Sequence, residues 1–243
     1  MKKVLILILL LLLQACTRGN MQIEGIDIAW LGHDGFRIQA SGKLIYFDPY
    51  QIKTSFHDAD LLLITHEHYD HCSPEDIERV IKPSTIVITI PECQSKLSKI
   101  AGNVADIILM EPFQEQQREN IKIETIPAYN VNKFRSPDLA FHPREDGRVG
   151  FIIDIAGRRI YHAGDTDFIP EMKELKSIDI ALIPVSGTYV MTPEEAAQAV
   201  ESFKPKYAVP MHYSSIIGTQ KDAEKFRNMV KSSKVVILKK TSS

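Results

Sequence analysis

Short apolar runs of strand length recur along the whole chain, and segments with helical spacing separate them. The run at 61–64 is continuously apolar, which is typical of a strand covered on both faces, whereas 121–126 alternates between apolar and polar positions. Ala156 and Gly157 lie between two strand-like segments and predict a hairpin turn. The predicted strands span residues 26–30, 36–38, 44–47, 61–64, 85–90, 121–126, 150–155, 159–162, 180–183, 207–210 and 235–238.

Helix-start signals occur in both halves of the chain. Ser73 is an N-cap residue followed by proline at the first helical position, and Thr192 forms a capping box with Glu195. A further helix is predicted at about 221–229. This interleaving of helices and strands predicts an α/β fold. Two sheets packed face to face with helices outside, a four-layer αββα sandwich, satisfy the pattern, although other α/β layouts satisfy it too.

The N-terminal residues differ from the rest. Two lysines precede an apolar run at 4–13, which is too short to span a bilayer and has the length of the central region of a signal peptide. The run is followed by Cys16 in the sequence LQAC, which resembles a bacterial lipobox and implies lipidation of Cys16. We therefore expect an exported protein that is lipid-anchored to a bacterial membrane in the cell envelope. A plain secretory signal with an incidental cysteine is the alternative.

The expected cleavage divides the chain into a signal peptide at 1–15, a tether at 16–22 and one folded domain at 23–243, since no glycine-, serine- or proline-rich linker interrupts the remainder. The formal net charge of −2 becomes −4 once the two lysines of the signal peptide are removed. This charge gives no support to a nucleic-acid partner. The sequence leaves open the oligomeric state and whether Cys72 and Cys93 pair.

Four metal-ligating side chains follow the apolar run at 61–64: His66, His68, Asp70 and His71. Neutral imidazole and carboxylate are the ligands that borderline divalent cations prefer. Residues two apart in an extended segment point the same way, so His66 and His68 can bind one ion together. Asp70 and His71 follow a turn and can face a second ion. The end of a buried strand is where α/β folds place their sites, which favours a metal site over a surface cluster.

This segment matches the H-x-H-x-D-H signature of the metallo-β-lactamase superfamily, and other segments resemble further motifs of that superfamily in the same order. YHAGDT at 161–166 resembles the G-D-T motif, and PMHY at 210–213 resembles the last motif. LGH at 31–33 and FDP at 47–49 resemble the opening strands of the lactonase-like branch, which includes ascorbate-6-phosphate lactonase. The resemblance covers residues 26–213 and implies the αββα sandwich.

Carried over to this chain, the resemblance implies two metal sites that share the carboxylate of Asp165. The first site is implied for His66, His68 and Asp165. The second site is implied for Asp70, His71, His212 and Asp165. We expect one or two divalent ions, with zinc first and manganese or iron as alternatives. Water held between two such ions is activated for attack on a carbonyl or phosphoryl centre, and Asp70 is expected to orient it or accept its proton.

One histidine of the family pattern is missing. The family places it at the end of a mid-chain strand, where this chain reads IPAYN at 126–130. Three accounts are open: Asn130 coordinates directly, His142 from the irregular segment 129–149 substitutes, or the first site is weak and the enzyme is mononuclear. The same segment contains four cationic side chains, namely Lys133, Arg135, Arg144 and Arg148. They are candidates to bind an anionic substrate group, although most of them are expected to be solvated.

Two further residues are candidates for the substrate pocket. His33, in a GHDG turn, is expected to line the pocket or to hydrogen bond to a ligand, with an ordinary turn histidine as the alternative. Tyr189 follows a buried strand and is expected to close the pocket or to donate to an oxyanion, unless its segment is only a turn.

Together these features predict a metal-dependent hydrolase that uses a metal-activated water on a small molecule with an ester, lactone, thioester or phosphoester bond. The alternative is a non-hydrolytic metal- or ligand-binding lipoprotein on a degenerate form of the same fold. The missing histidine is the main support for that alternative.

Overall fold

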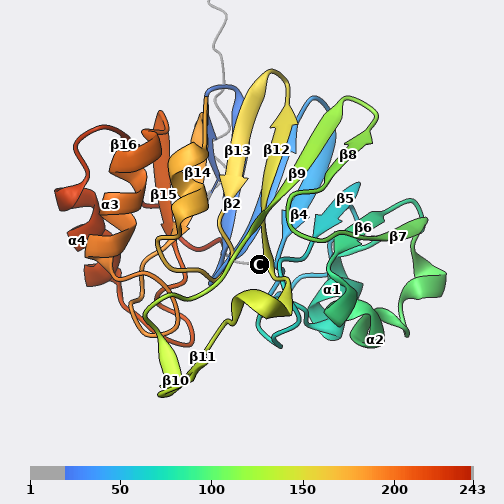
Figure 1. Cartoon of the computed structure of the whole chain (residues 1–243). Coiled ribbons are helices and arrows are strands. Elements are labelled where there is room, and N and C mark those ends of the chain that lie inside the picture. Colours follow the sequence, from blue (N-terminus) through green and yellow to red (C-terminus); the bar gives the residue numbers. More distant parts are fainter. Residues whose placement is uncertain (1–19, 242–243) are drawn as a thin grey trace, which may run out of the picture.

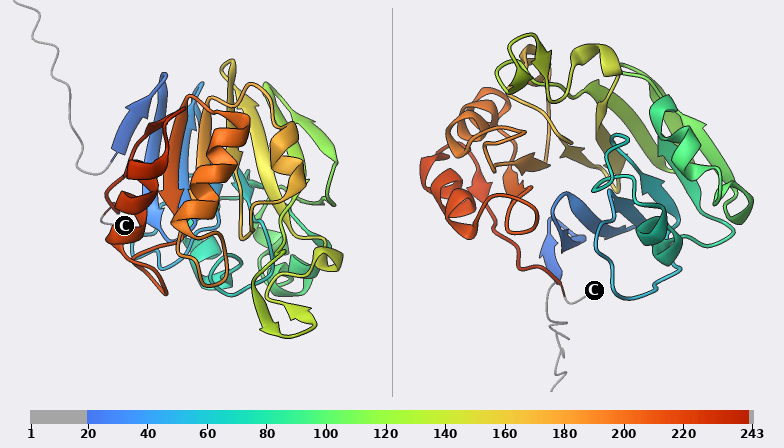
Figure 2. Two further views of the ribbon diagram at one scale, coloured as in Figure 1. Left: turned by 60° about the vertical axis from the view of Figure 1, so that its left-hand side comes forward. Right: turned by 90° about the horizontal axis from the view of Figure 1, so that it is seen from below.

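The computed structural model describes residues 20–241, which form two facing seven-stranded sheets with helices outside (Figures 1 and 2). The first sheet contains, in spatial order, β1 (Asn20–Ile23), β2 (Ile26–Gly32), β3 (Gly35–Ala40), β4 (Lys43–Phe47), β5 (Leu61–Leu63), β6 (Ile86–Thr89) and β7 (Asp106–Leu109). The second contains β16 (Lys234–Val235), β15 (Tyr207–Met211), β14 (Ile180–Pro184), β13 (Arg158–His162), β12 (Val149–Ile155), β9 (Ile121–Pro127) and β8 (Glu115–Arg118). The α/β sandwich fold is therefore confirmed.

Helices cover the outer faces of both sheets. α3 (Pro193–Phe203) and α4 (Gln220–Met229) pack outside the second sheet, while α1 (Pro74–Val80) and α2 (Gln94–Leu97) lie beside the first (Figures 1 and 2). The capping box predicted at the start of α3 is present, as is the N-cap serine of α1. Every residue of β5 and of β14 is buried, which explains why both strands read as continuous apolar runs.

Strand direction brings the loops with candidate ligands to one edge of each sheet. β4, β5 and β6 are parallel to one another, as are β13, β14 and β15. The carboxyl ends of parallel strands meet at the same edge, so the loops after β5, β13 and β15 emerge there. These three loops carry the HEHYDH segment, Asp165 and His212.

The C-terminal segment differs from the prediction, because a strand was expected at 235–238 and β16 ends at Val235. Beyond that point the chain leaves the second sheet and crosses to the first. Lys240 forms an isolated parallel bridge with Trp30, and the Thr241 amide donates to the Trp30 carbonyl at 2.9 Å. The last residues therefore join the two sheets instead of extending one.

Two other segments also differ from expectation. β1 begins at Asn20 and pairs antiparallel with β2, so the first sheet includes residues predicted to belong to the tether. The segment 129–149 is not wholly irregular, since it contains the hairpin of β10 (Phe134–Ser136) and β11 (Leu139–Ala140) and a 3-10 helix at Arg144–Asp146. The hairpin predicted at Ala156 and Gly157 is confirmed, with both residues at positive φ.

The predicted signal peptide and the lipidation site Cys16 lie outside the described residues. Between residues 20 and 241, no helix is both long enough and apolar enough to cross a membrane.

Candidate metal centre

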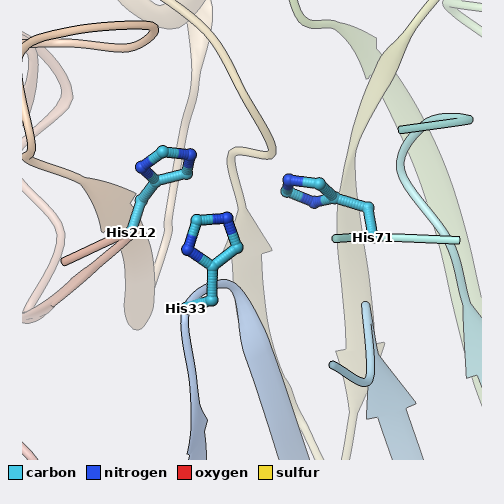
Figure 3. Close-up of side chains that lie close together, drawn as sticks. All are labelled: His33, His71 and His212. Atoms are coloured by element: carbon cyan, nitrogen blue, oxygen red, sulfur yellow. The ribbon is translucent and has the colours of Figure 1, made fainter. Parts of the chain in front are cut away.

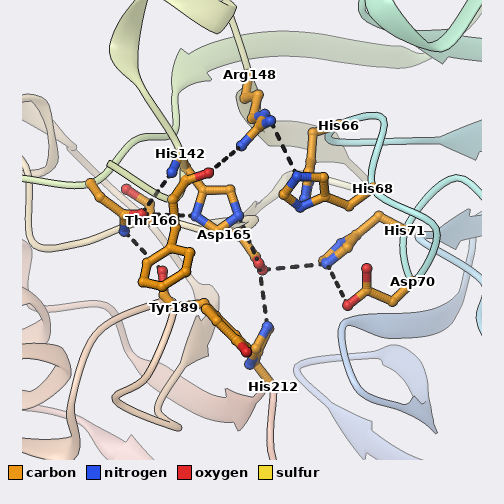
Figure 4. Close-up of polar contacts among 12 residues, drawn as sticks. His66, His68, Asp70, His71, His142, Arg148, Asp165, Thr166, Tyr189 and His212 are labelled. Atoms are coloured by element: carbon orange, nitrogen blue, oxygen red, sulfur yellow. Dashed lines mark hydrogen bonds and ion pairs between the residues drawn. The ribbon is translucent and has the colours of Figure 1, made fainter. Parts of the chain in front are cut away.

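The carboxylate of Asp165 lies among imidazoles from three separate stretches of the chain (Figure 4). His71 Nε2 is 3.4 Å from Oδ1 of Asp165, and the Nε2 atoms of His142 and His212 are each 3.3 Å from Oδ2. All four side chains are buried. The fold therefore gathers residues from the loops after β5, β11, β13 and β15 around one carboxylate.

Five groups of side chains between residues 20 and 241 are compact enough to hold an ion, and two of them contain His66. The ligand atoms of His66, His68 and His142 lie within 4.8 Å of one another, and those of His66, His71 and Asp165 do so as well. The first group includes both histidines that the resemblance assigns to the first metal. His142 completes it, and the carboxylate of Asp165, a member of the second group, lies 3.3 Å from His142 Nε2.

Four of these histidines have one ring nitrogen held by a neighbouring polar side chain. His66 Nδ1 lies 3.0 Å from Thr65 Oγ1, and His71 Nδ1 lies 2.8 Å from Asp48 Oδ2. His142 Nδ1 lies 2.9 Å from Asn130 Oδ1, and His212 Nδ1 lies 2.8 Å from Ser186 Oγ. Contacts of this kind fix the ring orientation and the tautomer of a ligating histidine. They leave the Nε2 atoms free to face the interior of the cluster.

Several of these inward-facing atoms are unpaired. The Nε2 atoms of His66, His71 and His142 and the Oδ1 atom of Asp165 are buried and have no hydrogen-bond partner among residues 20–241. Buried polar atoms are nearly always satisfied in a folded protein, so converging unpaired atoms indicate a missing partner. Imidazole nitrogen and carboxylate oxygen are the donors that a borderline divalent cation takes, and the residues therefore fit a metal ion.

Asp48 organises the first sheet's part of the centre. It accepts hydrogen bonds from the Thr65 amide at 2.8 Å and the Thr65 hydroxyl at 2.6 Å, as well as from His71 Nδ1. Because the Thr65 hydroxyl donates its only proton to Asp48, it must accept from His66 Nδ1. Both histidines thus carry a proton on Nδ1 and direct Nε2 toward the interior of the cluster. The sequence marked Asp48 only through the FDP motif, and Thr65 not at all.

Asn130 supports His142 directly. Its Oδ1 accepts from both the backbone amide and Nδ1 of His142, each at 2.9 Å, and its Nδ2 donates to the Tyr189 carbonyl at 2.9 Å. The amide oxygen already has two donors, which leaves it poorly placed to be a metal ligand as well. Among the three accounts of the missing histidine, the geometry favours substitution by His142, with Asn130 as the residue that orients it.

The surroundings of the cluster favour protonated imidazole beside Asp165 and neutral imidazole beside Arg148. Burial lowers the pKa of His66, and burial together with the nearby Arg148 guanidinium lowers the pKa of His68 to about 4. On the opposite side, burial is outweighed by the carboxylates of Asp165 and its neighbours, which raise the pKa of His71 and raise that of His212 to about 9. Bound divalent cations would supply the positive charge that these carboxylates stabilise, in place of the protons on His71 and His212.

His33 contacts Asp70 and lies beside His71 and His212 (Figure 3). Its Nε2 is 3.0 Å from Asp70 Oδ2, and its side chain is 1% exposed. Burial alone would raise the pKa of Asp70, but the His33 hydrogen bond and the charge of His71 lower it to about 2. The geometry therefore matches a hydrogen bond from His33 to a candidate metal ligand, and not a position of His33 in the pocket wall.

Asp34 is a residue of this region that the sequence did not single out. Its carboxylate is fully buried, and neither oxygen has a hydrogen-bond partner in the part of the chain that the structure describes. Burial raises its pKa well above the usual range, and its carboxylate lies close to the ligand atoms of His212 and Asp165. The only sequence feature that could have identified Asp34 was its position next to His33 in the GHDG turn.

Three of the thirteen non-glycine residues with a left-handed backbone between residues 20 and 241 lie in this region. His33, Asp48 and His212 adopt left-handed conformations, with φ of +52°, +37° and +58°. This conformation costs a non-glycine residue about 1 kcal/mol, and such strain gathers at functional sites. Gly164 has φ of +63°, and a Cβ there would lie 3.2 Å from the Thr65 side chain, so glycine lets Asp165 approach the first sheet.

A cavity of about 310 Å³ opens directly onto the centre. Its lining residues are His68, Tyr69, Asp70, Arg135, Phe141, His142, Asp165, Tyr189 and Ile216. Tyr189 therefore lies in the wall, and His33 is not among the lining residues. Two other hollows, of about 370 and 860 Å³, contain none of the predicted metal ligands.

Cys72 and Cys93 are both buried and both free, so no disulfide joins them. Neither thiol belongs to a potential metal-binding group among residues 20–241. Cys72 packs in the hydrophobic core directly after His71, as a small buried side chain.

Several proteins similar to this chain are described as metal-dependent hydrolases, which is consistent with the candidate metal centre. Residues 27–212 match the Beta-lactamase superfamily domain. The chain is 31% identical over 215 residues to a UPF0173 metal-dependent hydrolase of Caldivirga maquilingensis, covering 84% of this chain and 89% of the relative. It is also similar to the structure of a candidate metal-dependent hydrolase of Parabacteroides distasonis (34% identity, 90% and 96% of the two chains, TM-score 0.77). The metallo hydrolase Igni18 of Ignicoccus hospitalis is a further structural relative (27% identity, 89% and 96%, TM-score 0.70).

Replacement of the residues at the missing-histidine position tests the assignment of His142. We expect Asn130→Ala to weaken metal binding by about 10- to 100-fold, because His142 loses its orienting contact, and His142→Ala to weaken it further. Competition with a chromophoric chelator measures both affinities. Asn132→Ala, an exposed amide in the same segment, is the control and should leave the affinity unchanged. Unaltered affinity in both Asn130→Ala and His142→Ala would show that neither residue serves the metal.

Proposed function

Because the chain belongs to the beta-lactamase superfamily, and within it to the UPF0173 metal-dependent hydrolase family, we propose that the cluster around Asp165 binds two divalent cations and hydrolyses a small ester, lactone, thioester or phosphoester. The chain is a metal-dependent hydrolase, and the kind of bond it cleaves is the proposal. The observation that carries the proposal is the set of unpaired imidazole and carboxylate atoms facing one another beside a cavity.

The proposed ligands divide into two groups. His66, His68 and His142 would hold the first cation, and Asp70, His71 and His212 would hold the second, with Asp165 contributing to both. The mixture of imidazole and carboxylate favours zinc, with manganese or iron as alternatives. Bound divalent cations supply Lewis acidity, which lowers the pKa of water and polarises a carbonyl or phosphoryl oxygen.

The chain's own residues contribute orientation and proton transfer. Asp70 lines the cavity and is ionised at neutral pH, since its pKa is lowered to about 2, so it can accept a hydrogen bond that orients the attacking water. We infer that it also accepts the proton of that water. The His33 hydrogen bond holds that carboxylate in place. Arg148 donates to His68 Nε2 at 3.3 Å and pairs with Glu67, which restricts the His68 ring. Tyr189 in the cavity wall is placed to donate to a developing negative charge.

The finer placement within the superfamily and the cell is part of the proposal. The LGH and FDP segments support kinship with the lactonase-like branch, and the LQAC sequence supports export and lipidation at Cys16 in a bacterial envelope. We expect Cys16→Ser to move the protein from the membrane fraction to the soluble fraction after export. Continued membrane retention of this variant would remove the lipid anchor from the account.

Hydrolysis can be tested on a panel of lactone, thioester, carboxylic ester and phosphodiester substrates with the metal-loaded protein. We expect turnover of at least one class, with kcat/KM reduced by about 100-fold or more in His68→Ala and Asp165→Asn, because each variant removes a cation ligand. His57→Ala, an exposed histidine outside the cluster, is the matched control and should retain full activity.

Two outcomes would contradict the proposal. Stoichiometric metal without turnover of any class would favour a non-hydrolytic binding role on a degenerate fold. Turnover that survives in both ligand variants would place the chemistry elsewhere.

A further inference from the structure

The segment 129–149 carries four cationic side chains, and three of them are neutralised by carboxylates. Lys133 pairs with Asp167 at 3.1 Å and with Glu195 at 2.7 Å. Arg144 pairs with Glu171 at 2.8 Å. Arg148 pairs with Glu67 and also lies 3.2 Å from a carboxylate oxygen of Asp146. Carboxylates therefore already occupy these three cations.

Arg135 is the exception. It makes no ion pair with any residue between 20 and 241, and it is the one cation of this segment that lines the cavity at the centre. Its guanidinium lies 5.8 Å from the centroid of the Phe141 ring, a contact that orients the group without neutralising its charge. An unpaired guanidinium facing a cavity is suited to bind an anion, because its planar donors match carboxylate and phosphate oxygens.

The backbone of the hairpin explains why Arg135 faces the cavity. Phe134 pairs with Ala140 and Ser136 pairs with Leu139, so the register shifts at Arg135, as in a β-bulge. A bulge redirects a side chain and is frequent beside active sites. Asn130 and His142 flank the hairpin in the chain, and the Asn130 amide donates to the His142 carbonyl at 2.8 Å. Arg135 is thus tied through a few residues to the candidate metal ligand His142.

Apart from Arg135 and the candidate metal ligands, the cavity wall is aromatic or aliphatic. Phe141 and Tyr189 meet edge to face with ring centroids 4.8 Å apart, and Tyr69 and Ile216 are partly exposed at the rim. Apart from Arg135, the charged or ionisable residues of the lining belong to the candidate metal centre or are tyrosines. A volume of about 310 Å³ is small for a ligand pocket, which indicates a compact substrate.

We propose that Arg135 determines substrate specificity by binding a carboxylate or phosphate group of the substrate. The hydrolysable bond lies at the Asp165 cluster, and a short apolar segment against Phe141 and Tyr189 separates it from the anionic group. The substrate class is therefore a small anionic ester, lactone or thioester, and not a neutral one. This inference rests on the proposed hydrolytic function of the same site.

A pair of matched esters tests the inference. The mono-para-nitrophenyl ester of glutarate carries a terminal carboxylate, and para-nitrophenyl pentanoate has a methyl group in its place. We expect Arg135→Gln in the metal-loaded full chain to raise KM for the glutarate ester by about tenfold while leaving kcat and the pentanoate kinetics unchanged. Arg135→Lys should restore part of the loss. A third ester with a terminal phosphonate distinguishes a phosphate-binding role from a carboxylate-binding one.

Arg144→Gln is the matched control, because it removes an arginine of the same segment that already has a carboxylate partner. It should leave the kinetics of all three esters unchanged. Equal effects of Arg135→Gln on the charged and neutral esters would overturn the inference, and so would the absence of any effect.

A binding measurement separates this inference from hydrolysis itself. If the wild-type protein cleaves none of the esters, the ester form of the proposed function fails, and calorimetry with glutarate and butyrate on the zinc-loaded protein then tests Arg135 alone. Tighter binding of glutarate that is lost in Arg135→Gln would support the anion-binding role. Identical behaviour of the wild type and the variant would overturn it.

Discussion

The meeting of one carboxylate with imidazoles from both sheets is the constraint on which the rest of the centre depends. Asp165 projects from the loop after β13 of the second sheet, and His71 reaches it from the loop after β5 of the first. The second sheet's His212 approaches the other carboxylate oxygen. Gly164 permits this approach, since a side chain there would press on Thr65. The two sheets therefore cannot shift relative to each other without separating the candidate ligands.

A second layer of polar contacts converts this proximity into a defined arrangement. Asp48, Thr65, Asn130 and Ser186 each hold an imidazole by its Nδ1 atom. These contacts fix the orientation and the tautomer of each ring, so the Nε2 atoms face the space where the carboxylates favour a cation. Burial of so many polar groups opposes folding unless a partner satisfies them. A bound cation satisfies them, which links the stability of this region to its function.

Local sequence signals predicted much of this molecule, whereas contacts made only in the fold were not predictable. The HEHYDH segment was identifiable because strand and turn place its ligands within six residues. Asn130 and His142 were left as alternatives, since their mutual hydrogen bonds depend on a hairpin whose residues show no clear period. The role of Arg135 was equally hidden, because it depends on a register shift and on the neutralisation of neighbouring cations by distant carboxylates. The bridge between Lys240 and Trp30 joins residues at opposite ends of the described chain, so no local pattern could reveal it.

Anomalous scattering from crystals of the zinc-loaded protein tests the central claim most directly, because it locates each ion without reference to activity. The account predicts two peaks on either side of the Asp165 carboxylate, one beside His66, His68 and His142 and the other beside His71 and His212. Peaks remote from Asp165, or full occupancy of zinc at a different group of side chains, would contradict it.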